Sequence, residues 1–259
     1  MIFEMKPAIV GHRGFGAGER AGHRENTLES YLAAVAHGLS WIELDVRRSL
    51  DGQLVIWHNP VTADGEFIAG RTADELAGCG ILRLEDVMAA LPPGVAVNVD
   101  VKTIIEDALD PPHRRTGALV AEALGQHAGQ RRLFVSSFDP SLLTYLQERK
   151  DALPGVPLGL ITWLNFPVWH AIPAAANLGL DAVCLHTGTF GLHPKGQRPL
   201  QLTIETVIGL AHQAGLEVLA WSPTPEMAVR LASAGADALT VDDIPGVLAA
   251  LAGEAPAGA

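Results

Sequence analysis

The stretch WIELDVRRSLDGQLVIWH, residues 41–58, decides the fold of this chain. It holds two apolar extended segments, 41–46 and 53–58, and only six residues lie between them. A parallel crossover needs about a dozen residues, so this link is too short to provide one. Asp51-Gly52 is a typical two-residue turn, and we therefore expect the two segments to form an antiparallel hairpin.

Seven further extended segments flank this hairpin, and several of them begin just after a helical segment that ends at glycine. They cover residues 7–11, 95–101, 133–137, 158–162, 182–186, 217–221 and 238–241. Near-continuous apolar strands that alternate with helices indicate βα units around a covered parallel sheet. Because 53–58 belongs to the hairpin, eight strands remain for a closed barrel. The sequence therefore predicts an α/β protein, a (β/α)8 TIM barrel with an extra hairpin strand after barrel strand 2.

Composition favours one domain and excludes several kinds of partner. The 259 residues are 48% hydrophobic, which suits a single barrel domain over residues 1–252 with a flexible tail over 253–259. A net charge of -11 with scattered basic residues argues against nucleic acid and against anionic membranes. No apolar run approaches the roughly 18 residues of a membrane span. The first residues also lack the features of a secretory signal, and two cysteines indicate no disulfide framework. We expect a cytoplasmic protein.

Acidic side chains gather where two neighbouring strands end. Glu43 and Asp45 alternate along 41–46 and so face one way, as do Asp100 and Lys102 in NVDVK, residues 98–102. Carboxylates aimed at one point are costly to bury unless a positive partner joins them. A hard divalent cation bound by oxygen ligands is the simplest partner.

Other polar residues should reach the same place. Active sites of such barrels collect at the carboxyl ends of the strands. His12 and Arg13 end the first strand, and His58 comes back to the mouth from the hairpin. Near them, Asn26 with Glu29 resembles a capping box and predicts the start of a helix over 27–37.

The sequence resembles the glycerophosphodiester phosphodiesterases, a family of phospholipase C-like phosphodiesterase TIM barrels. The matching pieces, in order, are HRG (12–14), ENTLES (25–30), ELDV (43–46), HNP (58–60), RLEDVMAALP (83–92), VDVK (99–102), SSFDP (136–140), AWS (220–222) and VDDIP (241–245). The resemblance implies a bound Ca²⁺ or Mg²⁺ and hydrolysis of small-molecule glycerophosphodiesters to glycerol 3-phosphate and an alcohol. This chain departs from the usual pattern at Asp100, where the family usually has Glu, and at Asn59, where it usually has Asp.

By position, the resemblance also implies a role for each site residue. The metal ligands fall on Glu43, Asp45 and Asp100, the acid–base histidines on His12 and His58, and the phosphate-contacting cations on Arg13 and Lys102. Trp221, at a late strand end, forms either an apolar wall for glycerol or part of the core.

This chemistry accounts for the residue types. The oxygens of a phosphodiester anion must be neutralised as charge shifts in the transition state, and two imidazoles that titrate near neutrality suit proton transfer to and from the reacting oxygens. Either water or the glycerol hydroxyl of the substrate could attack, the latter through a cyclic phosphate. The preferred alcohol (choline, ethanolamine, inositol or glycerol), the choice between Ca²⁺ and Mg²⁺, and the oligomeric state stay open.

Alternative interpretations remain at this point. Glu43 and Asp45 could form structural ion pairs, Lys102 could simply neutralise Asp100, and residues 25–27 could serve only as a helix start. Two other functions compete with the leading one: a lipid phosphodiesterase similar to phospholipase D or sphingomyelinase D, and a degenerate barrel that binds phosphodiesters without cleaving them. Weaker candidates for contacts at the site are His23, Arg24, Ser137 and His186.

Overall fold

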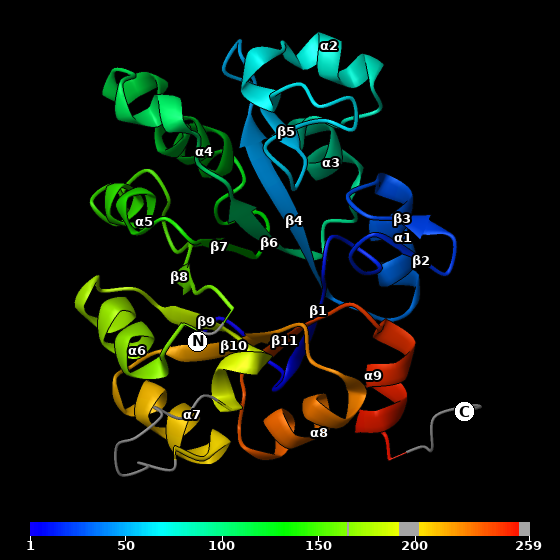
Figure 1. The fold of residues 1–259 in the computed structure, drawn as a ribbon, viewed down its shortest axis with the longest axis vertical. Coiled ribbons are helices and arrows are strands. Elements are labelled where there is room, and N and C mark those ends of the chain that lie inside the picture. Colours follow the sequence, from blue (N-terminus) through cyan, green and yellow to red (C-terminus); the bar gives the residue numbers. More distant parts are fainter. Residues whose placement is uncertain (165, 192–201, 254–259) are drawn as a thin grey trace.

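Eight parallel strands close into a barrel in the computed structural model, which describes residues 1–164, 166–191 and 202–253 (Figure 1). The strands, in their order around the barrel, are β1 (Ala8–Gly11), β11 (Ala238–Val241), β10 (Glu217–Trp221), β9 (Ala182–His186), β8 (Leu158–Ile161), β7 (Leu133–Ser137), β6 (Ala96–Val101) and β4 (Trp41–Arg48). Pairing of β4 with β1 closes the ring. The predicted (β/α)8 barrel is confirmed. The division at residue 252 stays a prediction, and 254–259 lie outside the described residues.

The predicted hairpin is also confirmed, and it forms because β4 is longer than the barrel needs. The first part of β4 pairs in parallel with β6, from Trp41 opposite Ala96 to Val46 opposite Val101. Its last residues pair antiparallel with β5 (Leu54–Ile56), outside the barrel. The extended segment expected over 53–58 therefore ends as a strand at Ile56, and the chain then returns to the barrel mouth.

Helices cover the outside of the barrel between successive strands (Figure 1). They are α1 (Leu28–Ala36), α2 (Ala73–Gly78), α3 (Leu84–Ala90), α4 (Thr116–Gly125), α5 (Pro140–Gln147), α6 (Val168–Asn177), α7 (Ile204–Gln213), α8 (Pro225–Ser233) and α9 (Ile244–Leu251). Short 3₁₀ turns occur at η1 (Ile68–Gly70), η2 (Ile105–Ala108), η3 (Pro112–Arg114) and η4 (Thr187–Gly191). Each described helix is too short or too polar to cross a lipid bilayer.

The start of α1 differs from the prediction. Thr27, and not Asn26, is the N-cap, and its hydroxyl accepts a hydrogen bond from the backbone N–H of Ser30 at 3.2 Å. Asn26 has a positive φ of 55° and turns its side chain into the protein. Just before it, β2 (Glu19–Arg20) and β3 (His23–Arg24) form a small hairpin that the sequence did not lead us to expect.

Aromatic side chains fill the amino-terminal end of the barrel interior. The ring of Phe3 lies 5.2 Å from Trp41 and 5.9 Å from Phe134, between ring centroids. Both partners stand near the beginnings of their strands, β4 and β7. Because this end is filled with apolar groups, the polar interior residues at the opposite, carboxyl end face a space that opens in one direction only.

Gly159 in β8 allows this packing, because a Cβ at that position would overlap the ring of Phe134. We expect Gly159→Ala to lower the free energy of unfolding by about 1–3 kcal/mol through overpacking. Gly209→Ala in α7 is the matched control. It adds the same methyl group to open space, and alanine favours a helix by about 1 kcal/mol over glycine. Urea unfolding measures both variants, and a Gly159→Ala protein as stable as Gly209→Ala would contradict this account of the barrel interior.

Candidate active site

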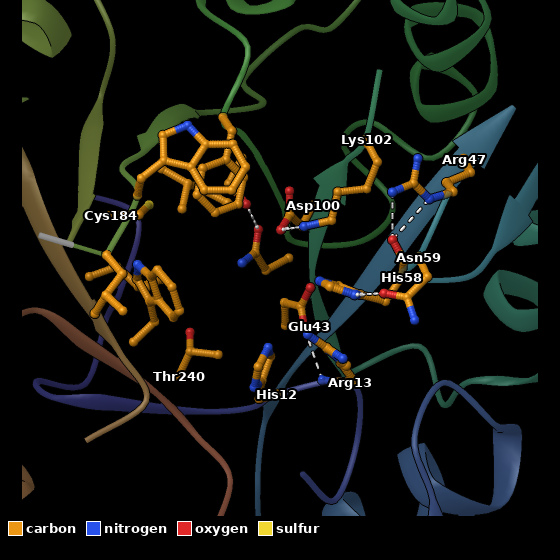
Figure 2. A pocket seen from close by; sticks show the side chains of 18 of the residues that line it. His12, Arg13, Glu43, Arg47, His58, Asn59, Asp100, Lys102, Cys184 and Thr240 are labelled. Atoms are coloured by element: carbon orange, nitrogen blue, oxygen red, sulfur yellow. Dashed lines mark hydrogen bonds and ion pairs between the residues drawn. The ribbon is translucent and has the colours of Figure 1, made fainter. Parts of the chain in front are cut away.

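The carboxyl end of the barrel holds a cavity of about 490 Å³, and most of the predicted site residues line it (Figure 2). These are His12, Arg13, Glu43, His58, Asp100, Lys102 and Trp221. The other lining residues are Arg47, Asn59, Pro60, Asn98, Ser136, Phe138, Ile161, Trp163, Leu164, Cys184, Leu219 and Thr240. Asp45 is buried beside them, at 1% exposure. The structure thus brings the whole predicted set to one place.

Strand register brings the three predicted metal ligands together. Asp45 of β4 stands directly opposite Asp100 of β6, and Glu43 faces the same side two residues earlier. One oxygen from each of the three carboxylates lies within 4.8 Å of the others, and all three residues are buried. Barrel pairing therefore creates a compact cluster of three acidic groups.

Electrostatics in this cluster are unfavourable without a further positive charge. Burial, followed by repulsion from Asp45, raises the pKa of Glu43 to about 8, although His12 acts in the opposite direction. Burial also raises the pKa of Asp100. For Asp45 burial alone would raise the pKa, but Lys102 and Arg13 outweigh it and the net change is downward. The protein therefore stabilises one ionised carboxylate well and leaves the other two costly to ionise.

The donor set fits a hard divalent cation. All three candidate ligands are carboxylates, the oxygen donors that Ca²⁺ and Mg²⁺ take in proteins. Oδ1 of Asp100 is buried and has no hydrogen-bond partner within the described residues. A buried acceptor without a partner is costly, and a cation at the cluster would supply one.

Lys102 and Arg13 are both paired with these acids. Nζ of Lys102 lies 3.2 Å from Oδ1 of Asp45 and also contacts Asp100. Nε of Arg13 lies 3.3 Å from Oδ2 of Asp45, and its Nη1 donates to Glu25 at 2.9 Å. In this structure Lys102 thus lies where a neutralising partner of Asp100 would lie. Contact of Lys102 or Arg13 with a phosphate stays a prediction.

The segment at 25–27 supports the site as well as starting a helix. Nδ2 of Asn26 donates to Oδ2 of Asp45 at 2.9 Å. The amide in turn accepts from the hydroxyl of the buried Tyr31 at 2.8 Å. Glu25 holds the guanidinium of Arg13, as described above. These contacts explain why Asn26 does not cap α1: its side chain fixes the orientation of a buried carboxylate.

His12 is oriented by Asp242, a residue that the sequence did not lead us to single out. Nδ1 of His12 lies 2.7 Å from Oδ1 of Asp242. The same carboxylate accepts from the backbone N–H of Ala17 at 2.8 Å and from the hydroxyl of Ser222 at 3.2 Å. Burial lowers the pKa of His12, but Asp242 and Glu43 outweigh it and the net pKa is raised. The position of Asp242 could have indicated a role at the site, because this residue directly follows the last barrel strand, β11.

His58 occupies a different environment. Its Nδ1 lies 2.9 Å from Oδ1 of Asn59, and its carbonyl accepts from Nε and Nη2 of Arg47 at 2.9 and 2.6 Å. Burial lowers the pKa of His58, and attraction to Asp45 offsets this only in part. Arg47 was also missed; it pairs with Val55 in the hairpin of β4 and β5, and its guanidinium fixes the backbone that carries His58. In both histidines the described contacts engage Nδ1, which leaves Nε2 for a ligand. Figure 2 shows the contact of His58 with Asn59.

The weaker candidates do not line the cavity. His23 pairs with Glu29 at 3.1 Å, and the guanidinium of Arg24 lies over the ring of Trp57. The remaining two make backbone contacts: the hydroxyl of Ser137 donates to the carbonyl of Val101 at 2.7 Å, and Nδ1 of His186 accepts from Gly188 at 2.9 Å.

Comparison with known proteins yields one family. The model of the "Glycerophosphoryl diester phosphodiesterase family" matches residues 12–245. A "Glycerophosphodiester phosphodiesterase" of Caldanaerobacter subterraneus is 26% identical, over 92% of this chain and 95% of the relative. A "Probable glycerophosphodiester phosphodiesterase 2" of Mycobacterium tuberculosis is 28% identical, over 82% of this chain and 78% of the relative.

Solved structures share the fold. A putative glycerophosphodiester phosphodiesterase of Galdieria sulphuraria has a TM-score of 0.76 and 23% identity, over 95% of this chain and 98% of that one. A phosphodiesterase of Oleispira antarctica, solved with the product sn-glycerol-3-phosphate, has a TM-score of 0.73 and 24% identity, over 95% of this chain and 97% of that one. The chain therefore belongs to the glycerophosphoryl diester phosphodiesterase family, which confirms the family and the enzyme class that its motifs predict.

Proposed function

We propose that this protein hydrolyses glycerophosphodiesters to glycerol 3-phosphate and an alcohol, with one divalent cation, Ca²⁺ or Mg²⁺, and two histidines. The observation that carries the proposal is the convergence of a buried carboxylate triad and two oriented imidazoles on one cavity. The Oleispira antarctica relative, which shares the fold, holds the expected product. We also propose that the protein described here is located in the cytoplasm and that its substrate is a small molecule.

Glu43, Asp45 and Asp100 would hold the cation. When bound, the cation would neutralise the carboxylates and polarise the phosphate oxygens. Lys102 and Arg13 approach the same cluster. With a cation sharing the carboxylates, these two side chains would have positive charge to offer the phosphate, where charge develops in the transition state. Trp221 would form part of the opposite wall of the substrate pocket.

The two histidines would divide acid and base roles according to their surroundings. Groups whose environments move their pKa values apart mark the acid and the base of a reaction. His12, with a raised pKa, would hold a proton and donate it to the departing alkoxide. His58, with a lowered pKa, would stay neutral and accept the proton of the attacking oxygen. This division holds whether water or the glycerol hydroxyl attacks.

Removal of either imidazole tests the acid–base roles. We expect His12→Ala and His58→Ala each to lower kcat by about 10²–10⁴-fold, with a melting temperature close to that of the wild type. The assay measures release of glycerol 3-phosphate from glycerophosphodiesters of choline, ethanolamine, inositol and glycerol. His23→Ala is the matched control, since that imidazole lies outside the cavity. Near-normal turnover by either site variant would refute its assignment.

Metal dependence has a readout that does not require activity. We expect a chelator to abolish turnover and to lower the melting temperature, and Ca²⁺ or Mg²⁺ to restore both. At a concentration 100 times Kd the cation should add about 2.7 kcal/mol to the free energy of unfolding. Asp100→Asn should lose this metal-linked stabilisation, whereas Asp86→Asn, which changes an exposed carboxylate on α3, should keep it. Turnover and stability that ignore both metals would contradict metal dependence, whereas a protein that neither binds metal nor cleaves any substrate would favour the degenerate barrel.

The role of Asp242 predicts a change in pH dependence. The protonated fraction of His12 falls as pH rises through its raised pKa, so kcat/KM should decrease on an alkaline limb above pH 6.5. The neutral fraction of His58 falls as pH drops through its lowered pKa, so kcat/KM should also decrease on an acid limb below pH 6.5. Asp242→Asn keeps an acceptor but removes the charge. It should therefore move the alkaline limb to lower pH without moving the acid limb.

Ser222→Ala is the control for that profile, because it removes one contact of Asp242 and leaves the carboxylate next to His12. We expect its alkaline limb to stay near that of the wild type. An Asp242→Asn profile that coincides with the wild-type profile would show that Asp242 does not set the protonation of His12.

A further inference from the structure

Arg47 differs from the other permanent cations of the cavity. Three arginine or lysine side chains line it: Arg13, Arg47 and Lys102. Arg13 and Lys102 are each paired with two carboxylates. Arg47 is only 8% exposed, and within residues 1–164, 166–191 and 202–253 it forms no ion pair. A buried charge without a partner is costly, so a ligand that brings an anion to this point would relieve that cost.

We propose that Arg47 binds a non-bridging oxygen of the scissile phosphate and is a third phosphate-binding cation of this site. The inference rests on the proposed function and adds to it a residue that contacts the substrate. Every glycerophosphodiester carries a negative charge at its phosphate, whatever its head group. This anion is therefore always present to pair with Arg47 when a substrate of the proposed class is bound.

Strand geometry places Arg47 just beyond the acidic cluster. Side chains two residues apart on a strand face the same way and are separated by about 6.6 Å along it. Arg47 follows Asp45 on β4 at this spacing. Lys102 follows Asp100 in the same way, and the two acids are direct partners between the strands. Figure 2 shows Arg47 and Lys102 on the same side of the cavity as His58. A phosphate held at the acidic cluster would therefore lie within the reach of both cations.

The guanidinium of Arg47 is already oriented, and one of its edges is open. Nε and Nη2 both donate to the carbonyl of His58, at 2.9 and 2.6 Å. A guanidinium has five N–H donors, so one donor of Nη2 and both donors of Nη1 remain. They make no other hydrogen bond among the described residues. Nη1 and Nη2 together form the end of the guanidinium fork, an edge that can bind two oxygens of one phosphate.

The contact with His58 also connects the phosphate to the histidine that we propose as the base. Because Arg47 holds the backbone of His58, a phosphate bound at the open edge has a defined position relative to that imidazole. Charge that develops on the phosphate oxygens in the transition state then meets a donor that is already in place. The next residue, Asn59, carries an amide and not a carboxylate, so it offers Arg47 no competing anion.

The first test measures anion binding without turnover. The full-length protein, in buffer with Mg²⁺, is titrated calorimetrically with inorganic phosphate and with sn-glycerol 3-phosphate. We expect Arg47→Met to raise the Kd of both anions at least about tenfold, because a charge-assisted contact to phosphate is lost. Arg47→Lys keeps a positive charge but not the fork, so it should raise both Kd values severalfold. It provides the same readout if Arg47→Met does not fold.

Arg24→Met is the matched control. It removes a guanidinium that lies over the ring of Trp57, beside His58 in sequence but outside the cavity. Only a long-range attraction that salt screens is lost, so both Kd values should stay near those of the wild type.

A double-mutant comparison separates direct contact from an effect through His58. If Arg47 only held His58 in place, Arg47→Met would not change the Kd of either anion in a His58→Ala protein. Direct contact predicts that the increase of about tenfold persists in that background. An increase that disappears there would overturn the inference.

Turnover shows which anionic group Arg47 binds. We expect Arg47→Met to lower kcat/KM by about 10²-fold, and equally for glycerophosphoethanolamine and glycerophosphoserine, which share the same phosphate. A loss confined to glycerophosphoserine would assign Arg47 to the head-group carboxylate and overturn the inference. If the wild type cleaves its substrates and the Arg47 variants bind both anions as the wild type does, the inference fails and the proposed function stands. If the wild type cleaves no substrate, the proposed function fails, and the calorimetric comparison still decides whether Arg47 binds phosphate.

Discussion

The interaction on which the rest of the site depends is the mutual repulsion of three carboxylates inside the barrel. Glu43, Asp45 and Asp100 are buried with oxygens within 4.8 Å of one another, an arrangement that is costly when all three are ionised unless positive charge compensates them. Lys102 and Arg13 compensate Asp45 most fully, while Glu43 keeps a pKa raised to about 8. The remaining deficit of positive charge supports our proposal that the cluster binds a cation and is more than a set of structural ion pairs.

Topology then decides which groups meet the cluster. The long strand β4 places two of the acids in the barrel and, through its hairpin with β5, brings His58 back to the mouth. The adjacent strands β1 and β11 end side by side, so His12 and Asp242 come together from opposite ends of the sequence. The two imidazoles therefore approach one cavity from different directions and in different electrostatic surroundings. That arrangement suits a substrate that both imidazoles contact, in a reaction where one oxygen loses a proton and another oxygen gains one.

Much of this could be predicted from the sequence, because the deciding signals are local or periodic. The short link between 41–46 and 53–58 defined the hairpin, and alternation along strands placed Glu43, Asp45 and Asp100 on one face. Residues whose roles depend on distant partners were harder to predict. Asn26 looked like a helix cap, and only the fold shows that its amide holds Asp45. Asp242 gains its meaning from His12, which is 230 residues away in the sequence.

The central claim is that a divalent cation relieves the repulsion in this cluster, and calorimetric titration of metal-free protein with Ca²⁺ or Mg²⁺ tests it most directly. Ligands must lose their protons to bind a metal, and a carboxyl with a pKa of about 8 is mostly protonated at pH 7. Titrations at pH 7 in buffers of different ionisation enthalpy should therefore show one cation bound with release of close to one proton, and much less release at pH 9.5. Absence of binding, or binding with no proton release at pH 7, would contradict the account.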